Sequence, residues 1–256
     1  MLQAHSILWH YLWVAPNLLL FVLAMLAWRR GLHKQFPVFF AFAIIGPIAQ
    51  LSVYAADVIP SVPAETFWRV FWAVLLVEAL LKFSLIGEIF AHVFGPYPSL
   101  VRLGRFLIRG VGVVLVLSAT MAAAYAPKDS PYWIIAGAHI LEQTIYLIEC
   151  GLLLFIFLFS AYFRLSSNRP IFGIALGLSI SACVHLATWA VMANSGLHAS
   201  QRSSIDFLNM AIYHACVLIW FYYLLVPPKF ATKSAVPIPE HNLEIWNREL
   251  ERFLQP

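Results

Sequence analysis

The sequence predicts an all-α integral membrane protein built as a bundle of seven transmembrane helices, and two observations support this. Of its 256 residues, 62% are hydrophobic and only 11% are charged, whereas soluble domains carry about 25% charged residues. Seven apolar stretches reach the roughly 20 residues that a helix needs to cross a bilayer: 7–28, 37–56, 67–91, 106–125, 132–163, 170–193 and 205–226. We therefore expect residues 1–228 to form one transmembrane domain and 229–256 to form a tail.

The positions of lysine and arginine predict the orientation, because cytoplasmic loops of membrane proteins are enriched in both. Only Arg69, Lys128 and Arg202 lie on one side of the predicted bilayer, and Lys82 lies inside a span. The other side holds Arg29, Arg30, Lys34, Arg102, Arg105, Arg109, Arg164, Arg169, Lys229, Lys233, Arg248 and Arg252. We expect a multi-pass protein of the cell membrane (the inner membrane in a bacterium), with its N-terminus outside and its C-terminus in the cytoplasm.

The formal net charge of +4 follows from this basic inner surface. Such a surface is attracted to the anionic lipid headgroups of the cytoplasmic leaflet. The partners expected from charge are therefore the bilayer and its headgroups, and not nucleic acid.

The first two predicted spans each carry a stripe of polar residues. In the first the residues recur every seven positions, and in the second they follow an i, i+3, i+7, i+10 pattern, so each set stays on one side of its helix. The stripes comprise Gln3, His10 and Asn17 in the first span and Pro47, Gln50, Tyr54 and Asp57 in the second. The simplest interpretation is polar packing between helices.

The third predicted span carries charges inside the bilayer. Glu78 precedes Lys82 by four residues, which is the favourable order for an ion pair along a helix. Glu88 lies near the inner end of the same span, with His92 one turn further on. Neutralisation of Glu78 by Lys82 within the helix and a functional role are both compatible with this spacing.

The fifth predicted span carries the most ionisable residues. His139, Glu142, Tyr146 and Glu149 lie at i, i+3, i+7 and i+10, so they form one stripe along a helix. Each ionisable group in a membrane helix costs roughly 2.5–3.5 kcal/mol on insertion scales. This face is therefore expected to point into the bundle, where other helices supply partners.

The sixth predicted span has small residues at a regular interval. Gly173, Gly177, Ser181 and His185 are each four residues apart. Small side chains at this spacing let two membrane helices approach closely. We expect His185 to lie at the outer end of this packing surface and to face a neighbouring helix.

The seventh predicted span adds a further polar face. Asp206, Asn209 and Tyr213 share one side of the helix, with His214 at its edge. Cys150, Cys183 and Cys216 all fall within spans and are interpreted as small packing residues rather than as a disulfide framework.

Two parts of the chain carry no candidate site. The fourth predicted span has only Ser118 and Thr120 as polar residues, which is typical of a spacer or lipid-facing helix. In the tail, apolar and charged residues separate onto two faces of a short amphipathic helix ending near Leu254. That helix is expected to lie on the inner leaflet or to dock on the bundle.

The candidate residues of different spans lie at similar depths below the outer ends of their helices. At about 1.5 Å per residue, His139 lies about 10 Å below the outer end of its span, and His185 and His214 about 13 Å below theirs. Glu142 and Glu78 come out near 15 and 17 Å on the same scale. The sequence therefore predicts a polar core in the outer half of the bundle, comprising Glu78, Lys82, His139, Glu142, Tyr146, Glu149, His185 and His214.

Charge balance indicates what this core would hold. The spans contain Glu78, Glu88, Glu142 and Glu149 but only one lysine. Carboxylates in a low dielectric that lack a cation become protonated, pair with histidinium or bind a metal ion. Protons or cations are therefore the expected partners.

Four classes of membrane protein fit this pattern. The leading interpretation is a sensor or receptor module that takes a proton, cation or small ligand and signals to a separate cytoplasmic or membrane protein. The second is a redox subunit that binds haem between facing histidines, or a divalent metal through His139, Glu142 and His185. The third is a proton- or cation-coupled carrier, and the fourth is a structural membrane subunit. No nucleophile elbow or HExxH motif occurs, so the sequence does not favour an enzyme.

Overall fold

All regular secondary structure in the described residues is α-helical. The computed structural model describes residues 6–95, 100–104, 106, 109–110, 113–114, 117, 133–162, 168–194 and 199–226. Its helices are α1 (Ile7–Arg29), α2 (Leu32–Gln35), α3 (Pro37–Val58), α4 (Ala64–Val93), α6 (Trp133–Tyr162), α7 (Arg169–Asn194) and α8 (Ala199–Leu225), with further helical residues between 100 and 117.

Six of these helices are long and apolar enough to cross a membrane: α1, α3, α4, α6, α7 and α8. They coincide with six of the seven predicted spans, so the all-helical, membrane-type architecture is confirmed. The fourth predicted span, 106–125, and the tail, 229–256, lie mostly or wholly outside the described residues. The short helix α2 was not expected, and Gly31 makes the turn before it with a positive φ of 70°.

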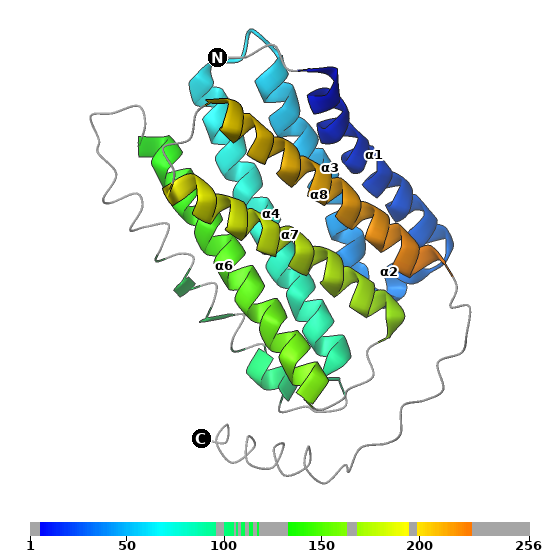
Figure 1. Ribbon diagram of the computed structural model, residues 1–256. Coiled ribbons are helices and arrows are strands. Elements are labelled where there is room, and N and C mark those ends of the chain that lie inside the picture. Colours follow the sequence, from blue (N-terminus) through cyan, green and yellow to red (C-terminus); the bar gives the residue numbers. More distant parts are fainter. Residues whose placement is uncertain are drawn as a thin grey trace.

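The six long helices form a closed ring in the order α1, α3, α4, α6, α7, α8 and back to α1 (Figure 1). Four of the six neighbouring pairs are antiparallel, whereas α4 and α6 run in the same direction, as do α8 and α1. Lys82 lies beside Glu149, and Phe90 stacks on Phe155 further along both helices. The chain that joins the end of α4 to the start of α6 must therefore return from one end of the bundle to the other.

The outer surface of the ring is apolar, as a bilayer requires. Large hydrophobic side chains point outward from every long helix, for example Leu18, Ile48, Leu80, Leu158, Val191 and Leu218. Exposed apolar area on this scale would be a liability in water. The interior contains a continuous cluster of aromatic and aliphatic side chains that includes Phe39, Ile86, Leu153 and Trp220.

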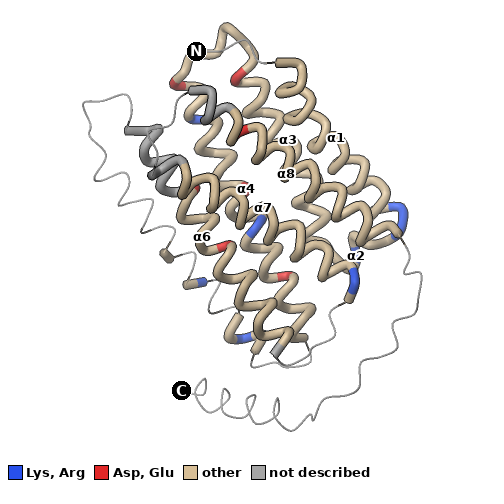
Figure 2. Tube along the Cα trace, viewed as in Figure 1, with Lys and Arg blue, Asp and Glu red and all other residues tan. Residues whose placement is uncertain are grey.

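Most of the described lysine and arginine residues lie at one end of the bundle (Figure 2). Arg29, Arg30 and Lys34 lie at the end where α1 leads into α2, and Arg169 begins α7 at that same end. At the opposite end, Arg69 pairs with Glu65 one turn earlier in α4. Lys82 lies between the two ends, inside the ring.

Glu88 caps a neighbouring helix. Its two carboxylate oxygens accept hydrogen bonds from the backbone N–H groups of Val38 and Phe39, at 3.0 and 2.9 Å. The first N–H groups of a helix have no partner within the helix, and in an apolar environment they need one. One of the four carboxylates expected within the spans therefore stabilises the start of α3.

Helices α7 and α8 pack closely at two glycines. A Cβ atom built on Gly177 would lie 2.8 Å from Cε2 of Trp220, and one built on Gly173 would lie 3.0 Å from Cδ2 of Tyr223. Both distances are shorter than a normal carbon–carbon contact. This close packing brings Ser181 and His185 of α7 to the same cavity as Tyr213 and Trp220 of α8.

Candidate functional site

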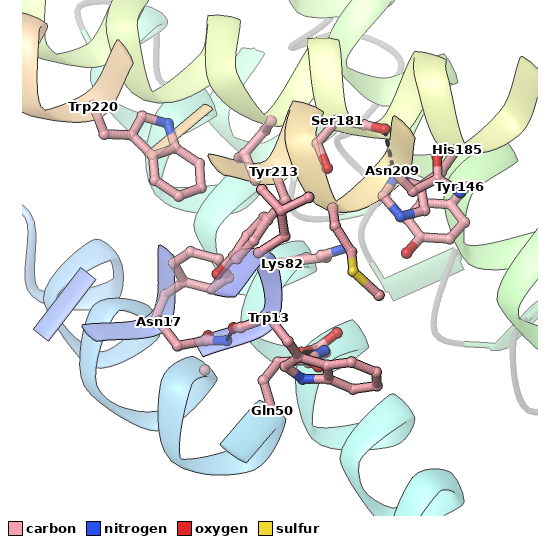
Figure 3. A pocket seen from close by; sticks show the side chains of 16 residues that line it. Trp13, Asn17, Gln50, Lys82, Tyr146, Ser181, His185, Asn209, Tyr213 and Trp220 are labelled. Carbon is pink, nitrogen blue, oxygen red and sulfur yellow. Dashed lines mark hydrogen bonds between the residues drawn. The ribbon is translucent and has the colours of Figure 1, made fainter. Parts of the chain in front are cut away.

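A cavity of about 190 Å³ lies inside the ring, and all six long helices contribute to its wall. In Figure 3, Lys82 projects among the lining side chains, with Asn17 and Gln50 on one side of it and Tyr146 and His185 on the other. The lining residues are Leu12, Trp13, Asn17, Phe42, Gly46, Gln50, Glu78, Lys82, Tyr146, Leu178, Ser181, His185, Asn209, Met210, Tyr213 and Trp220.

The wall formed by α3 and α4 holds a carboxylate paired with an amide. Gln50 donates a hydrogen bond from Nε2 to Oε1 of Glu78. Within the described part of the chain, Glu78 has no cation at ion-pair distance. An ion pair along α4 between Glu78 and Lys82 was one interpretation of the sequence, but Lys82 instead pairs with α6.

The wall formed by α1 is shaped by a proline. Pro16 has no N–H, so the carbonyl of Leu12, one turn earlier, loses its helical hydrogen bond. The side chain of Asn17 is 2% exposed and donates from Nδ2 to the carbonyl of Trp13 at 2.7 Å. Its other polar atom, Oδ1, is buried and has no hydrogen-bond partner among the residues that the structure describes. Since buried polar atoms are nearly always satisfied, Oδ1 is an unsatisfied acceptor on a residue of the cavity wall.

The centre of the site is a buried ion pair between α4 and α6. Nζ of Lys82 lies 3.6 Å from Oε2 of Glu149, and the Glu149 side chain is almost fully buried. Nζ also lies 4.6 Å from the centre of the Tyr146 ring, in a cation–π arrangement. Glu149 is absent from the cavity wall, so it lies behind Lys82 and supplies that lysine's counter-charge.

Helices α6 and α7 meet through stacked rings. The Tyr146 and His185 rings have centroids 4.5 Å apart and planes inclined by 22°. Nδ1 of His185 lies 2.9 Å from the carbonyl oxygen of Ser181. A carbonyl can only accept, so Nδ1 carries the proton, and in the neutral ring Nε2 is then the acceptor.

Helix α8 completes the wall with Asn209, Met210, Tyr213 and Trp220. Oδ1 of Asn209 lies 3.1 Å from Oγ1 of Thr188 on α7. Trp220 donates from Nε1 to the carbonyl of Ile174 at 3.3 Å. Both bonds tie α8 to α7, so the two helices present their polar groups to the cavity in a fixed register.

The predicted site residues divide between the cavity wall and its surroundings. Glu78, Lys82, Tyr146 and His185 line the cavity, and Glu149 lies behind Lys82. Glu142, one turn before Tyr146, is half-buried.

The two other predicted histidines are not seen in the cavity wall. His214 packs against Tyr11 of α1, with ring centroids 5.9 Å apart, and is not a lining residue. His139 lies in α6, but its side chain is outside the described residues. The predicted metal set of His139, Glu142 and His185 therefore stays a prediction, and no group of three potential metal ligands occurs among the described side chains.

Several lining residues were visible in the sequence as stripes but were not assigned to the site. Asn17 of the first stripe and Gln50 of the second both line the cavity. The same two stripes also meet at His10 and Tyr54, since Nδ1 of His10 lies 2.9 Å from the Tyr54 hydroxyl. The spacing of polar residues within each span was the available signal. It could not show that α1 and α3 face each other.

No protein family model, curated protein or solved structure matches this chain.

Proposed function

We propose that this chain is a seven-span sensor or receptor module of the cell membrane, which binds a small ligand in its central cavity. The observation that carries the proposal is that side chains from all six described long helices line one cavity. A ligand held there would touch every helix of the ring, so its binding free energy can favour one arrangement of the helices over another.

The size of the cavity limits the ligand. An engineered cavity of about 150 Å³ in another protein binds benzene, and this cavity measures about 190 Å³. Pockets for drug-sized molecules are larger, about 300–1,000 Å³. The proposed ligand therefore contains about one ring or an equivalent hydrocarbon body.

The seventh span and the orientation are part of the proposal. Because α4 and α6 run in the same direction, the segment between Gly95 and Trp133 would cross the membrane once more. The excess of lysine and arginine at the proposed inner end supports an outer N-terminus and a cytoplasmic C-terminus. Reporters fused after Gly95, before Trp133 and at the C-terminus should give inside, outside and inside. Equal readings at Gly95 and Trp133 would contradict seven spans.

Filling the cavity tests the binding site. Gly46 lines the cavity, and a Cβ atom there would meet nothing closer than Cε2 of Phe42 at 4.0 Å. Gly46→Leu should therefore fold normally and occupy the ligand's space. Gly151→Leu is the matched control, because Gly151 is exposed on α6 and a Cβ there has no neighbour within 4 Å.

The assay uses three single-ring probes of similar size and different charge: benzylamine, benzyl alcohol and benzoate. We expect at least one to bind the purified full chain in calorimetry and to raise its unfolding temperature. Binding should be lost in Gly46→Leu and kept in Gly151→Leu. If none of the probes binds, or if Gly46→Leu binds as well as the natural chain, the proposed function is wrong.

A flux measurement separates a receptor from a carrier. In liposomes containing the protein, a receptor should bind the radiolabelled probe without moving it across the membrane. Protein-dependent accumulation of the probe in the lumen would instead identify a carrier.

A further inference from the structure

We infer that the cavity binds a small protonated amine, with the ammonium group at Glu78 and a single-ring body against the aromatic wall. This inference rests on the proposed ligand-binding function and names the chemical class of the ligand. It depends on three features of the cavity: its charges, its open hydrogen-bond acceptors and its aromatic faces.

The charges leave one carboxylate in the wall without a cation. Lys82 lies 3.6 Å from Glu149, behind the wall, and is thereby committed to it. Glu78 lines the cavity and accepts a hydrogen bond from the neutral amide of Gln50, and no lysine or arginine among the described residues lies within ion-pair distance of it. A carboxylate buried without a cation is costly, so a positively charged ligand complements Glu78.

The hydrogen-bond capacity of the wall points in the same direction. Asn17 lines the cavity, and its Oδ1 is buried with no hydrogen-bond partner among the described residues. Nε2 of His185 is an acceptor, because Nδ1 is committed to the carbonyl of Ser181. Gln50 occupies only one oxygen of Glu78. Acceptors on both sides of the cavity are complemented by a ligand with several N–H donors, which an ammonium group provides.

The remaining wall suits an organic cation better than a bare metal ion. Five of the lining side chains are aromatic: Trp13, Phe42, Tyr146, Tyr213 and Trp220. Lys82 and His185 already lie against the Tyr146 ring, so the other four supply the aromatic surface for a ligand. Aromatic faces attract cations by their quadrupole, which is the basis of ammonium recognition in aromatic cages. Leu12, Leu178 and Met210 add apolar area for a hydrocarbon body.

An anionic ligand is disfavoured by the same geometry. Among the described residues that line the cavity, Lys82 is the only lysine or arginine. Its charge is already shared between Glu149 and the Tyr146 ring. A carboxylate in the cavity would also face Glu78 and the open acceptors.

The experiment compares benzylamine, benzyl alcohol and benzoate by calorimetry on the full chain in detergent. Benzylamine should bind roughly tenfold or more tightly than benzyl alcohol, because a charge-assisted hydrogen bond in a dry site is worth at least that factor. Benzoate should bind most weakly. Benzyltrimethylammonium, which keeps the charge but has no N–H group, should bind more weakly than benzylamine.

Two substitutions assign the effect to the site. Glu78→Gln should remove most of the preference for benzylamine over benzyl alcohol, and Asn17→Ala should weaken benzylamine by about twofold to tenfold. Glu65→Gln is the matched control, because Glu65 lies on the same helix but is exposed and pairs with Arg69. It should leave all affinities unchanged.

The outcomes separate this inference from the proposed function. If benzyl alcohol or benzoate binds as tightly as benzylamine, the amine inference is overturned while the ligand-binding cavity stands. If Glu78→Gln keeps the full preference, the ammonium group is not at Glu78. If no probe binds, the proposed function fails and this inference fails with it. Should a variant not fold, the order of the four probes on the natural chain decides the matter.

Discussion

Replacing Gly177 with alanine should loosen the contact between α7 and α8. The new methyl group would lie 2.8 Å from Cε2 of Trp220, within a packed interface. Such overpacking typically costs about 1–3 kcal/mol. Displacing the indole would also break its hydrogen bond from Nε1 to the carbonyl of Ile174, which is worth about 1 kcal/mol.

A matched substitution isolates this cost. Glycine to alanine inside a helix stabilises by about 1 kcal/mol through helix propensity, and Gly151→Ala should show this gain alone because nothing lies within 4 Å of its new Cβ. Since the propensity gain is common to both variants, their unfolding free energies should differ by about 2–4 kcal/mol.

The assay is thermal unfolding of both variants in the same detergent, followed by circular dichroism. Gly177→Ala should unfold at a lower temperature than the natural chain, and Gly151→Ala at an equal or higher temperature. Benzylamine binding should also weaken in Gly177→Ala, because Trp220 lines the cavity. If Gly177→Ala is as stable as Gly151→Ala, α7 and α8 are not packed as described and the reasoning is refuted.

Three further predictions test other contacts of the bundle. Lys82→Met leaves Glu149 as a buried charge without its cation, so it should lower the unfolding free energy by about 3–5 kcal/mol. Adding Glu149→Gln should recover most of that loss. A double variant no more stable than Lys82→Met would contradict the ion pair. Glu88→Gln should lower the unfolding free energy by about 1–2 kcal/mol, because it weakens the cap of α3. The same thermal unfolding assay measures this, and an unchanged unfolding midpoint would contradict the cap. The Sγ atoms of Cys150 and Cys183 lie 3.8 Å apart, so copper phenanthroline should join α6 to α7 in a disulfide that Cys150→Ser abolishes. Only Cys216 should then stay free, and three free thiols after oxidation would contradict this packing.

Helix positions and membrane character could be predicted because both are local properties of the chain. A run of about 20 apolar residues leaves few alternatives to a spanning helix in lipid, where every backbone polar group must be satisfied within the segment. The spacing of polar residues likewise placed Tyr146 and Glu149 on one face of α6 before any partner was known. Six of the predicted spans therefore match the described helices closely.

The pairing between helices could not be predicted, because it depends on which faces meet. The spacing of Glu78 and Lys82 favoured a pair within one helix, yet Lys82 lies beside Glu149 and Glu78 beside Gln50. Both arrangements satisfy the same helical pattern, and only the packing of α4 between α3 and α6 selects one.

The roles of individual polar residues were likewise decided by tertiary structure. Glu88 looked like a further buried charge, and its role as a cap appeared only once the start of α3 was placed beside it. His214 adjoins the polar face of its helix, but a rotation of about 100° per residue separates it from Tyr213, and it packs against Tyr11. The pattern of polar residues along each helix shows which of them need an interior, and the ring of helices decides which of them share the cavity.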